Sequence, residues 1–136
     1  MIKIIYGKKG MGKTKILVDE ANKHGAGGSG NVVFIDYHNQ LMYDLKHEVR
    51  FINVSEFPVR NAEAFLGFIC GIISANYDVN GIFIDGLTYI LKQDIESLQP
   101  FFMKLEEVSK KFNMEFHISI NGDPDLCPDY IKGYLV

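Results

Sequence analysis

The sequence predicts an α/β fold, a three-layer α/β/α arrangement with a largely parallel sheet of five or six strands. Short β-branched apolar runs alternate along the chain with segments whose apolar residues recur at helical spacing. This alternation is typical of right-handed crossovers, which place helices on both faces of a parallel sheet. The chain has 136 residues, of which 47% are hydrophobic. We therefore expect residues 1–136 to form a single domain with one sizeable core.

Strands are predicted where β-branched and aromatic residues cluster between glycine or polar stops. The first of these runs ends abruptly at Gly7. The predicted strands are Ile2–Tyr6, Val32–Asp36, an extended piece at Arg50–Val54, Ile82–Asp85 and Glu115–Ile120, with a short edge strand at Gly133–Val136 as a sixth candidate.

Helices are predicted where apolar residues recur three or four positions apart. The predicted helices are Lys13–Lys23, Asn39–His47, Ala62–Tyr77 and one that carries an apolar stripe from Leu98 to Phe112. Glycine residues predict two of the segments that connect these elements. Four glycines in seven residues favour a flexible loop at Gly25–Asn31, and Asn80-Gly81 is expected to turn the chain.

The composition narrows the class of partner and the compartment. A formal net charge of −3 gives no overall cationic field, which disfavours a nucleic-acid partner. No stretch approaches the roughly 20 apolar residues that span a bilayer, and the opening apolar run is too short for a signal peptide. Cys70 and Cys127 stand far apart without metal-ligand spacing, which indicates reduced thiols and a cytoplasmic protein.

The most specific motif is the segment Gly7-Lys8-Lys9-Gly10-Met11-Gly12-Lys13-Thr14, which satisfies G-x-x-x-x-G-K-[ST] at every fixed position. It lies between a predicted strand and a predicted helix, where small residues let backbone N–H groups converge on phosphate oxygens. Lys13 would contact the β- and γ-phosphates, and the Thr14 hydroxyl would be a ligand to magnesium. All eight residues are therefore predicted to bind a nucleoside triphosphate, for which we expect ATP with Mg²⁺.

A second acidic position supports this prediction. Gly81-Ile82-Phe83-Ile84-Asp85 places a carboxylate at the C-terminal end of a predicted strand, which is where ligands gather in an open parallel sheet. Asp85 would hold Mg²⁺ through water, in the manner of a Walker B aspartate. The same pattern recurs at Val32–Asp36, and Asp85 is the better magnesium candidate from its position in the chain order.

With these motifs, most of the chain resembles the P-loop NTPases, and within them the RecA-like ATPases. The resemblance covers the Gly7–Thr14 loop, the Val32–Asp36 strand, the segment from Ile82 to Thr88 and the strand from Phe116 to Asn121. It implies that the last strand lies between the loop strand and the Asp85 strand. It also implies catalytic roles for Asn121, as a polar sensor beside the γ-phosphate, for Asp36, as the base, and for Lys13.

The sequence departs from this family in two respects. Many P-loop ATPases carry a Glu directly after the Walker B Asp, and here Gly86 stands at that position. The chain also has only Arg50 and Arg60 as candidates for an arginine finger. Four histidines, His24, His38, His47 and His117, lack H-x-x-x-H spacing and are expected to be packing or surface residues.

The leading hypothesis is a small Mg²⁺-dependent ATPase that serves as a switch or motor core, read by a protein partner or through self-association. One alternative is a nucleotide-binding adaptor without turnover, which Gly86 motivates. Another is a small-molecule kinase, which the small number of arginines and the lack of an obvious lid disfavour.

Overall fold

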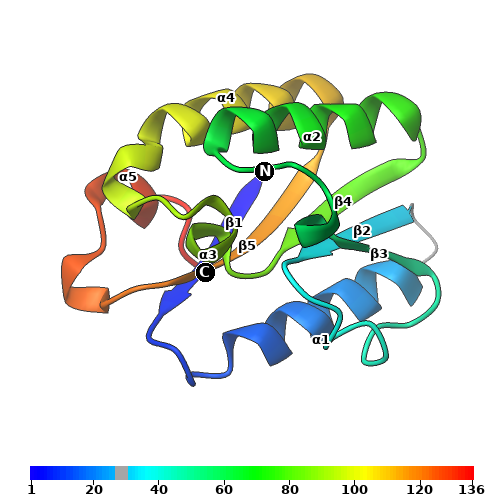
Figure 1. The fold of residues 1–136 in the computed structure, drawn as a ribbon, viewed down its shortest axis with the longest axis horizontal. Helices are drawn as coiled ribbons and strands as arrows, with labels where there is room; N and C mark the ends of the chain where they lie inside the picture. The colour runs from blue at the N-terminus through cyan, green and yellow to red at the C-terminus, as the bar shows by residue number, and fades with distance from the viewer. Residues whose placement is uncertain (27–30) are drawn as a thin grey trace.

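Five parallel strands form one sheet in the computed structural model, which describes residues 1–26 and 31–136 (Figure 1). The strands are β1 (Ile2–Gly7), β2 (Asn31–Asp36), β3 (Val49–Asn53), β4 (Val79–Ile84) and β5 (Glu115–Asn121). Their order across the sheet is β1-β5-β4-β2-β3, and every neighbouring pair is parallel. The predicted parallel sheet is confirmed, and it has five strands.

Helices cover both faces of this sheet. Helix α1 (Lys13–Ala26) lies on one face, while α2 (Ala62–Ala75) and α4 (Gln99–Phe112) lie side by side on the other (Figure 1). Shorter helical segments lie between these elements or after the last strand, namely η1 (Val54–Glu56), α3 (Leu87–Leu91), η2 (Ile95–Leu98), η3 (Pro124–Leu126) and α5 (Asp129–Lys132). The predicted three-layer α/β/α arrangement is therefore confirmed.

The strands are apolar on both faces because each face packs against helices. In β2, Val33 and Ile35 belong to the core on the side of α2 and α4. Val32 and Phe34 alternate with them and pack against Leu17 and the rest of the α1 side. This alternation follows from the two-residue period of a strand, and it explains why β2 reads as a continuous apolar run.

Local signals set the ends of the long helices. The Asn61 side chain accepts a hydrogen bond from the Ala64 N–H and caps α2 at its start. Helix α4 has Pro100 in its first turn, as expected, and is capped after Phe112 by Asn113, which adopts a left-handed conformation with φ of 51°. Its first and last turns therefore match the sequence prediction closely.

Three local predictions are wrong. Asn39–His47 forms turns and bends instead of a helix. Its backbone is held by α1, since Asn22 donates to the Asp44 carbonyl at 3.1 Å and accepts from the Lys46 N–H at 2.8 Å. These tertiary hydrogen bonds replace those of a helix whose apolar stripe is too short to compete.

Asn80-Gly81 does not turn the chain, because both residues lie inside β4, which starts at the buried Val79. The turn comes earlier, where Asn76 caps the end of α2. The segment Gly133–Val136 forms no sixth strand. It is limited to an isolated parallel bridge between Ile4 and Leu135.

The predicted loop at Gly25–Asn31 falls partly outside the described residues. Gly25 and Ala26 extend α1, and Asn31 begins β2, while residues 27–30 lie outside the described part of the chain. None of the helices among the described residues is long and apolar enough to cross a membrane.

Candidate functional site

The carboxyl ends of the parallel strands meet at one edge of the sheet, where the structure has a cavity of about 1050 Å³. Strand β1 runs into the glycine-rich loop, defined here as residues 7–14, and this loop leads directly into α1. Most of the residues predicted for the site line the cavity, namely Lys9, Gly10, Gly12, Lys13, Thr14, Asp36, Asp85 and Asn121. The topology therefore gathers residues from four separate parts of the chain.

The glycine-rich loop needs glycine at two positions for conformational reasons. Gly10 has φ of 89° and Gly12 has φ of 81°, in the left-handed region that disfavours other residues. A Cβ atom at either position would meet no heavy atom within 4 Å, so the space beside the loop is open. The first N–H groups of α1 have no acceptor within the helix, and Gly12, Lys13 and Thr14 at its start line the cavity. This arrangement suits an anion.

Lys13 is a cation held in a confined position. Its side chain is buried, and its Nζ donates to the Lys8 carbonyl oxygen at 2.7 Å. Burial lowers the pKa of Lys13, and the nearby Asp85 carboxylate partly opposes this shift. An ammonium group has three donors, so Lys13 can hold the loop carbonyl and still contact a ligand in the cavity.

Asp85 stands at the centre of a hydrogen-bond chain. The Thr14 hydroxyl donates to its two carboxylate oxygens, at 3.2 and 3.1 Å. The Ser119 hydroxyl donates to Asp85 Oδ1 at 2.6 Å and accepts from the Gly86 N–H at 2.8 Å. Thr14 and Asp85 are thus brought together as predicted, and both are oxygen donors of the kind that Mg²⁺ prefers.

Ser119 is a site residue that the sequence analysis missed. It lies on β5 two positions before Asn121, so both side chains point to the same face of the sheet. The available signal was a serine between two isoleucines in a predicted strand, because a hydroxyl that becomes buried requires a partner. The partner is Asp85, and its identity depends on the pairing of β4 with β5, which the glycine-rich motif does not specify.

Asp36 is buried, with one oxygen that lacks a hydrogen bond. Oδ1 accepts from the Tyr37 N–H at 2.7 Å, while Oδ2 has no hydrogen-bond partner among the described residues. The nearest basic atom is His38 Nδ1, at 3.5 Å from Oδ2. Burial raises the pKa of Asp36 to about 6, the Asp85 charge adds to the increase, and the Tyr37 N–H and His38 oppose it.

The remaining predicted residues take different positions. Asn121 pairs in register with Gly7 and lines the cavity from an exposed position. Gly7, Lys8 and Met11 do not line it. Gly7 ends β1, Lys8 contributes the carbonyl that Lys13 contacts, and Met11 is 67% exposed.

Neither arginine lines the cavity. Arg50 donates to Asn76 Oδ1 at 2.9 Å and to Asp78 Oδ2 at 3.0 Å, near the start of β3 and β4. That position is at the opposite edge of the sheet. Arg60 is exposed just before α2. Neither Arg50 nor Arg60 is therefore positioned to contact a ligand in the cavity.

The position of β5 between β1 and β4 is the one that the resemblance to RecA-like ATPases implied. The sequence matches no family model and no curated protein. Among solved structures, the fold is similar to the crystal structure of flagellar accessory protein FlaH from Methanocaldococcus jannaschii, with a TM-score of 0.54 and 13% sequence identity. The match covers 96% of this chain and 64% of that chain, and it supports the fold alone.

The substitution Asp36→Asn is expected to stabilise the fold at neutral and alkaline pH. Because the pKa of Asp36 is raised to about 6 in the folded state, its ionisation lowers stability as the pH rises from its unfolded pKa to its folded one. An amide carries no charge, so the variant avoids this loss. The gain in the free energy of unfolding should reach about 2–3 kcal/mol above about pH 7 and vanish below about pH 4.

Urea unfolding across this pH range measures the difference. Asp129→Asn is the matched control, because the Asp129 side chain is 96% exposed and its loss should change stability little at any pH. A gain for Asp36→Asn that does not depend on pH would contradict the assigned cause.

Proposed function

We propose that the chain binds ATP with Mg²⁺ in the cavity at the carboxyl edge of the sheet and hydrolyses it slowly. The observation that carries this proposal is the convergence of the glycine-rich loop, Lys13 and the Thr14–Asp85 pair on one cavity. A loop with open space at Gly10 and Gly12 suits a bulky anion. The lysine and the two oxygen donors supply what a magnesium triphosphate needs.

Each residue would then have a distinct task. The N–H groups at the start of α1 would donate to phosphate oxygens, and Lys13 would add a charge-assisted contact. Thr14 and Asp85 would hold the magnesium, with Asp85 kept in position by Ser119. Magnesium would supply positive charge to the phosphate oxygens when it is bound.

Asp36 supports turnover as well as binding. Asp36 lines the same cavity, and its buried Oδ2 has no hydrogen-bond partner in the described part of the chain. Its pKa of about 6 is close to the operating pH that favours a general base. Strand β2 lies next to β4, so Asp36 and Asp85 end neighbouring strands. We therefore assign to Asp36 the role of accepting the proton from an attacking water, and to Asn121 a contact with the terminal phosphate.

A second candidate function is a nucleotide-binding adaptor without turnover. Gly86 occupies the position after Asp85, and no arginine of the chain lines the cavity, so two common aids to hydrolysis are missing. The structure offers nothing specific in favour of a kinase. Measured ATP turnover decides between the ATPase and the adaptor.

The proposed ATPase would act with a protein partner or with further copies of itself. The similar structure FlaH is titled a flagellar accessory protein. By analogy with that title, this chain would act as an accessory to a partner. Residues at the strand ends, among them Asp36 and Asn121, would make different contacts depending on which nucleotide is bound. These differences would transmit the nucleotide state to the partner.

Lys13→Ala is expected to weaken ATP binding by about 10- to 100-fold, because it removes a charge-assisted contact in a confined site. Lys23→Ala is the matched control, since Lys23 lies on the same helix, is exposed and pairs with the partly exposed Glu20. Titration calorimetry with a non-hydrolysable ATP analogue gives both affinities. Equal affinity of the two variants for the ATP analogue would contradict the proposed binding site.

Asp85→Asn is expected to reduce the effect of magnesium on nucleotide affinity while the fold is retained. The amide oxygen of Asn can still accept from Thr14 or Ser119, but the negative charge that balances the metal ion is lost. Nucleotide affinity is measured with Mg²⁺ and with EDTA, in wild type, in this variant and in Asp129→Asn. A magnesium effect of the same size in all three proteins would place the metal elsewhere.

Asp36→Asn is expected to abolish ATP turnover while it spares ATP binding, because the amide cannot accept a proton. Phosphate release under saturating ATP measures turnover, and calorimetry on the same preparation measures binding. Turnover in the variant at the wild-type rate would move the base to another residue. No turnover in the wild type, with binding intact, would favour the adaptor.

A further inference from the structure

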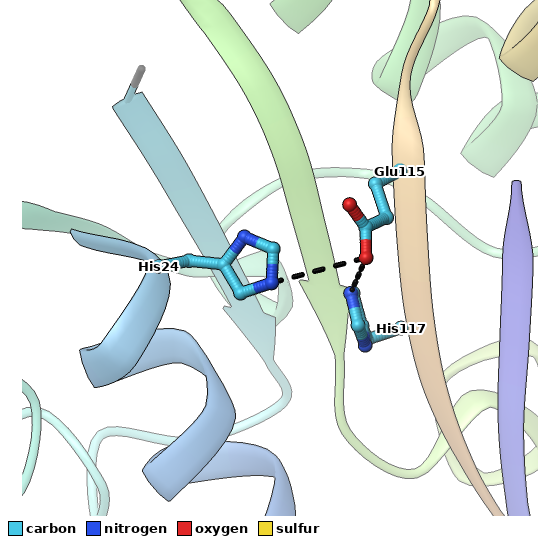
Figure 2. Close-up of side chains that lie close together, drawn as sticks. All are labelled: His24, Glu115 and His117. Carbon is cyan, nitrogen blue, oxygen red and sulfur yellow. Dashed lines mark hydrogen bonds and ion pairs between the residues drawn. The ribbon is translucent and has the colours of Figure 1, made fainter. Parts of the chain in front are cut away.

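Two histidines and a glutamate meet on the α1 side of the sheet, away from the cavity. His24 comes from the last turn of α1, and Glu115 and His117 come from the start of β5 (Figure 2). Their side chains point toward one another, and one ligand atom of each lies within 4.8 Å of the other two. None of the three lines the cavity. We propose that they form a binding site for a divalent transition-metal ion of the zinc type.

The distances fit such an ion with small adjustments. His117 Nε2 lies 2.8 Å and His24 Nε2 lies 3.8 Å from Glu115 Oε1. Zinc bonds of about 2.0–2.1 Å in a tetrahedral site place neighbouring ligand atoms roughly 3.3 Å apart. The two separations lie on either side of this value. Binding requires the His117–Glu115 contact to open slightly and His24 to approach.

The fold holds the ligands in place. Glu115 and His117 are two residues apart on a strand, so they share one face of the sheet. The His117 ring stacks on Phe83 with 4.3 Å between ring centroids and an interplanar angle of 5°, which fixes the plane of the imidazole. Gly81 pairs with Glu115 in register and leaves room beside the His24 ring.

The type of ligand selects the type of metal. Imidazole nitrogens with one carboxylate suit zinc and its neighbours in the transition series, whereas calcium and magnesium require mainly oxygen ligands. The His24 and Glu115 side chains are 28% and 30% exposed, so an ion can enter from solvent. A fourth position would be open to water, as in sites with three protein ligands.

One neighbouring charge opposes the ion. Lys3 Nζ lies 3.5 Å from Glu115 Oε1, and its side chain is 39% exposed. A lysine on a long, solvated stem can leave this contact at little cost, because exposed ion pairs contribute little stability. The end of α1 favours a cation, since the helix dipole is negative there. The ion would then tie this end of α1 to β5.

Zinc titration of nucleotide-free protein tests the proposal after the protein has been stripped with EDTA and dialysed. We expect one equivalent of Zn²⁺ to bind and to raise the Tm, because a ligand that binds only the folded state stabilises it. His24→Gln and Glu115→Gln should each weaken the zinc affinity by at least about 100-fold, since loss of an outer-shell partner alone costs 10- to 100-fold.

His47→Gln is the matched control. The His47 side chain is 95% exposed, and its Nε2 lies 3.6 Å from Glu48 Oε1. The substitution His47→Gln should leave the zinc affinity unchanged. The Co²⁺ spectrum of the wild-type protein gives a second measurement that needs no variant to fold, and a four-coordinate site with nitrogen and oxygen ligands is expected. The absence of a zinc-dependent rise in Tm, or zinc affinities equal in His24→Gln and His47→Gln, would overturn the proposal. In that case the cluster is a hydrogen-bonded packing network.

Discussion

The hydrogen bonds around Asp85 hold the cavity edge of the molecule together. Thr14 comes from α1, Asp85 follows β4 and Ser119 belongs to β5, so this one carboxylate joins a helix to two strands. The Gly86 N–H in turn donates a hydrogen bond to the Ser119 hydroxyl. The half-buried Asp85 carboxylate therefore has several hydrogen-bond donors to compensate its removal from water. The orientation of α1, and with it the conformation of the glycine-rich loop, depends on this set of contacts.

Asp36 differs from Asp85 in its surroundings. It ends β2, as Asp85 follows the neighbouring β4, yet its buried Oδ2 has no hydrogen bond within residues 1–26 and 31–136, and burial raises its pKa to about 6. A carboxyl group in this state lowers the stability of the fold at neutral pH. Such a loss is common where a residue is poised for chemistry, because activity and stability place different demands on the same side chain. Two neighbouring strands thus end in acids with different environments.

The sequence was sufficient for features that depend on local pattern. The glycine-rich loop follows from its spacing, and the parallel sheet follows from alternating periodicity. The prediction failed where tertiary contacts override local preference, as at Asn39–His47, whose backbone is held by Asn22. It also failed at Asn80-Gly81, where pairing with neighbouring strands outweighs a turn dipeptide. Ser119 and the meeting of His24 with Glu115 depend on packing between distant segments, which spacing along the chain does not reveal.

Helix α1 connects the two proposed binding sites. Its first turn borders the cavity with Lys13 and Thr14, and its last turn carries His24. The helix dipole favours an anion at the first end and a cation at the second, so a triphosphate and a metal ion would each complement the end they occupy. Between these ends, β5 places Glu115, His117 and Ser119 on the face that α1 covers. If both proposed ligands bind, a shift of α1 that one of them favours would change the contacts of the other. Thermodynamic linkage would then make the effect on affinity reciprocal.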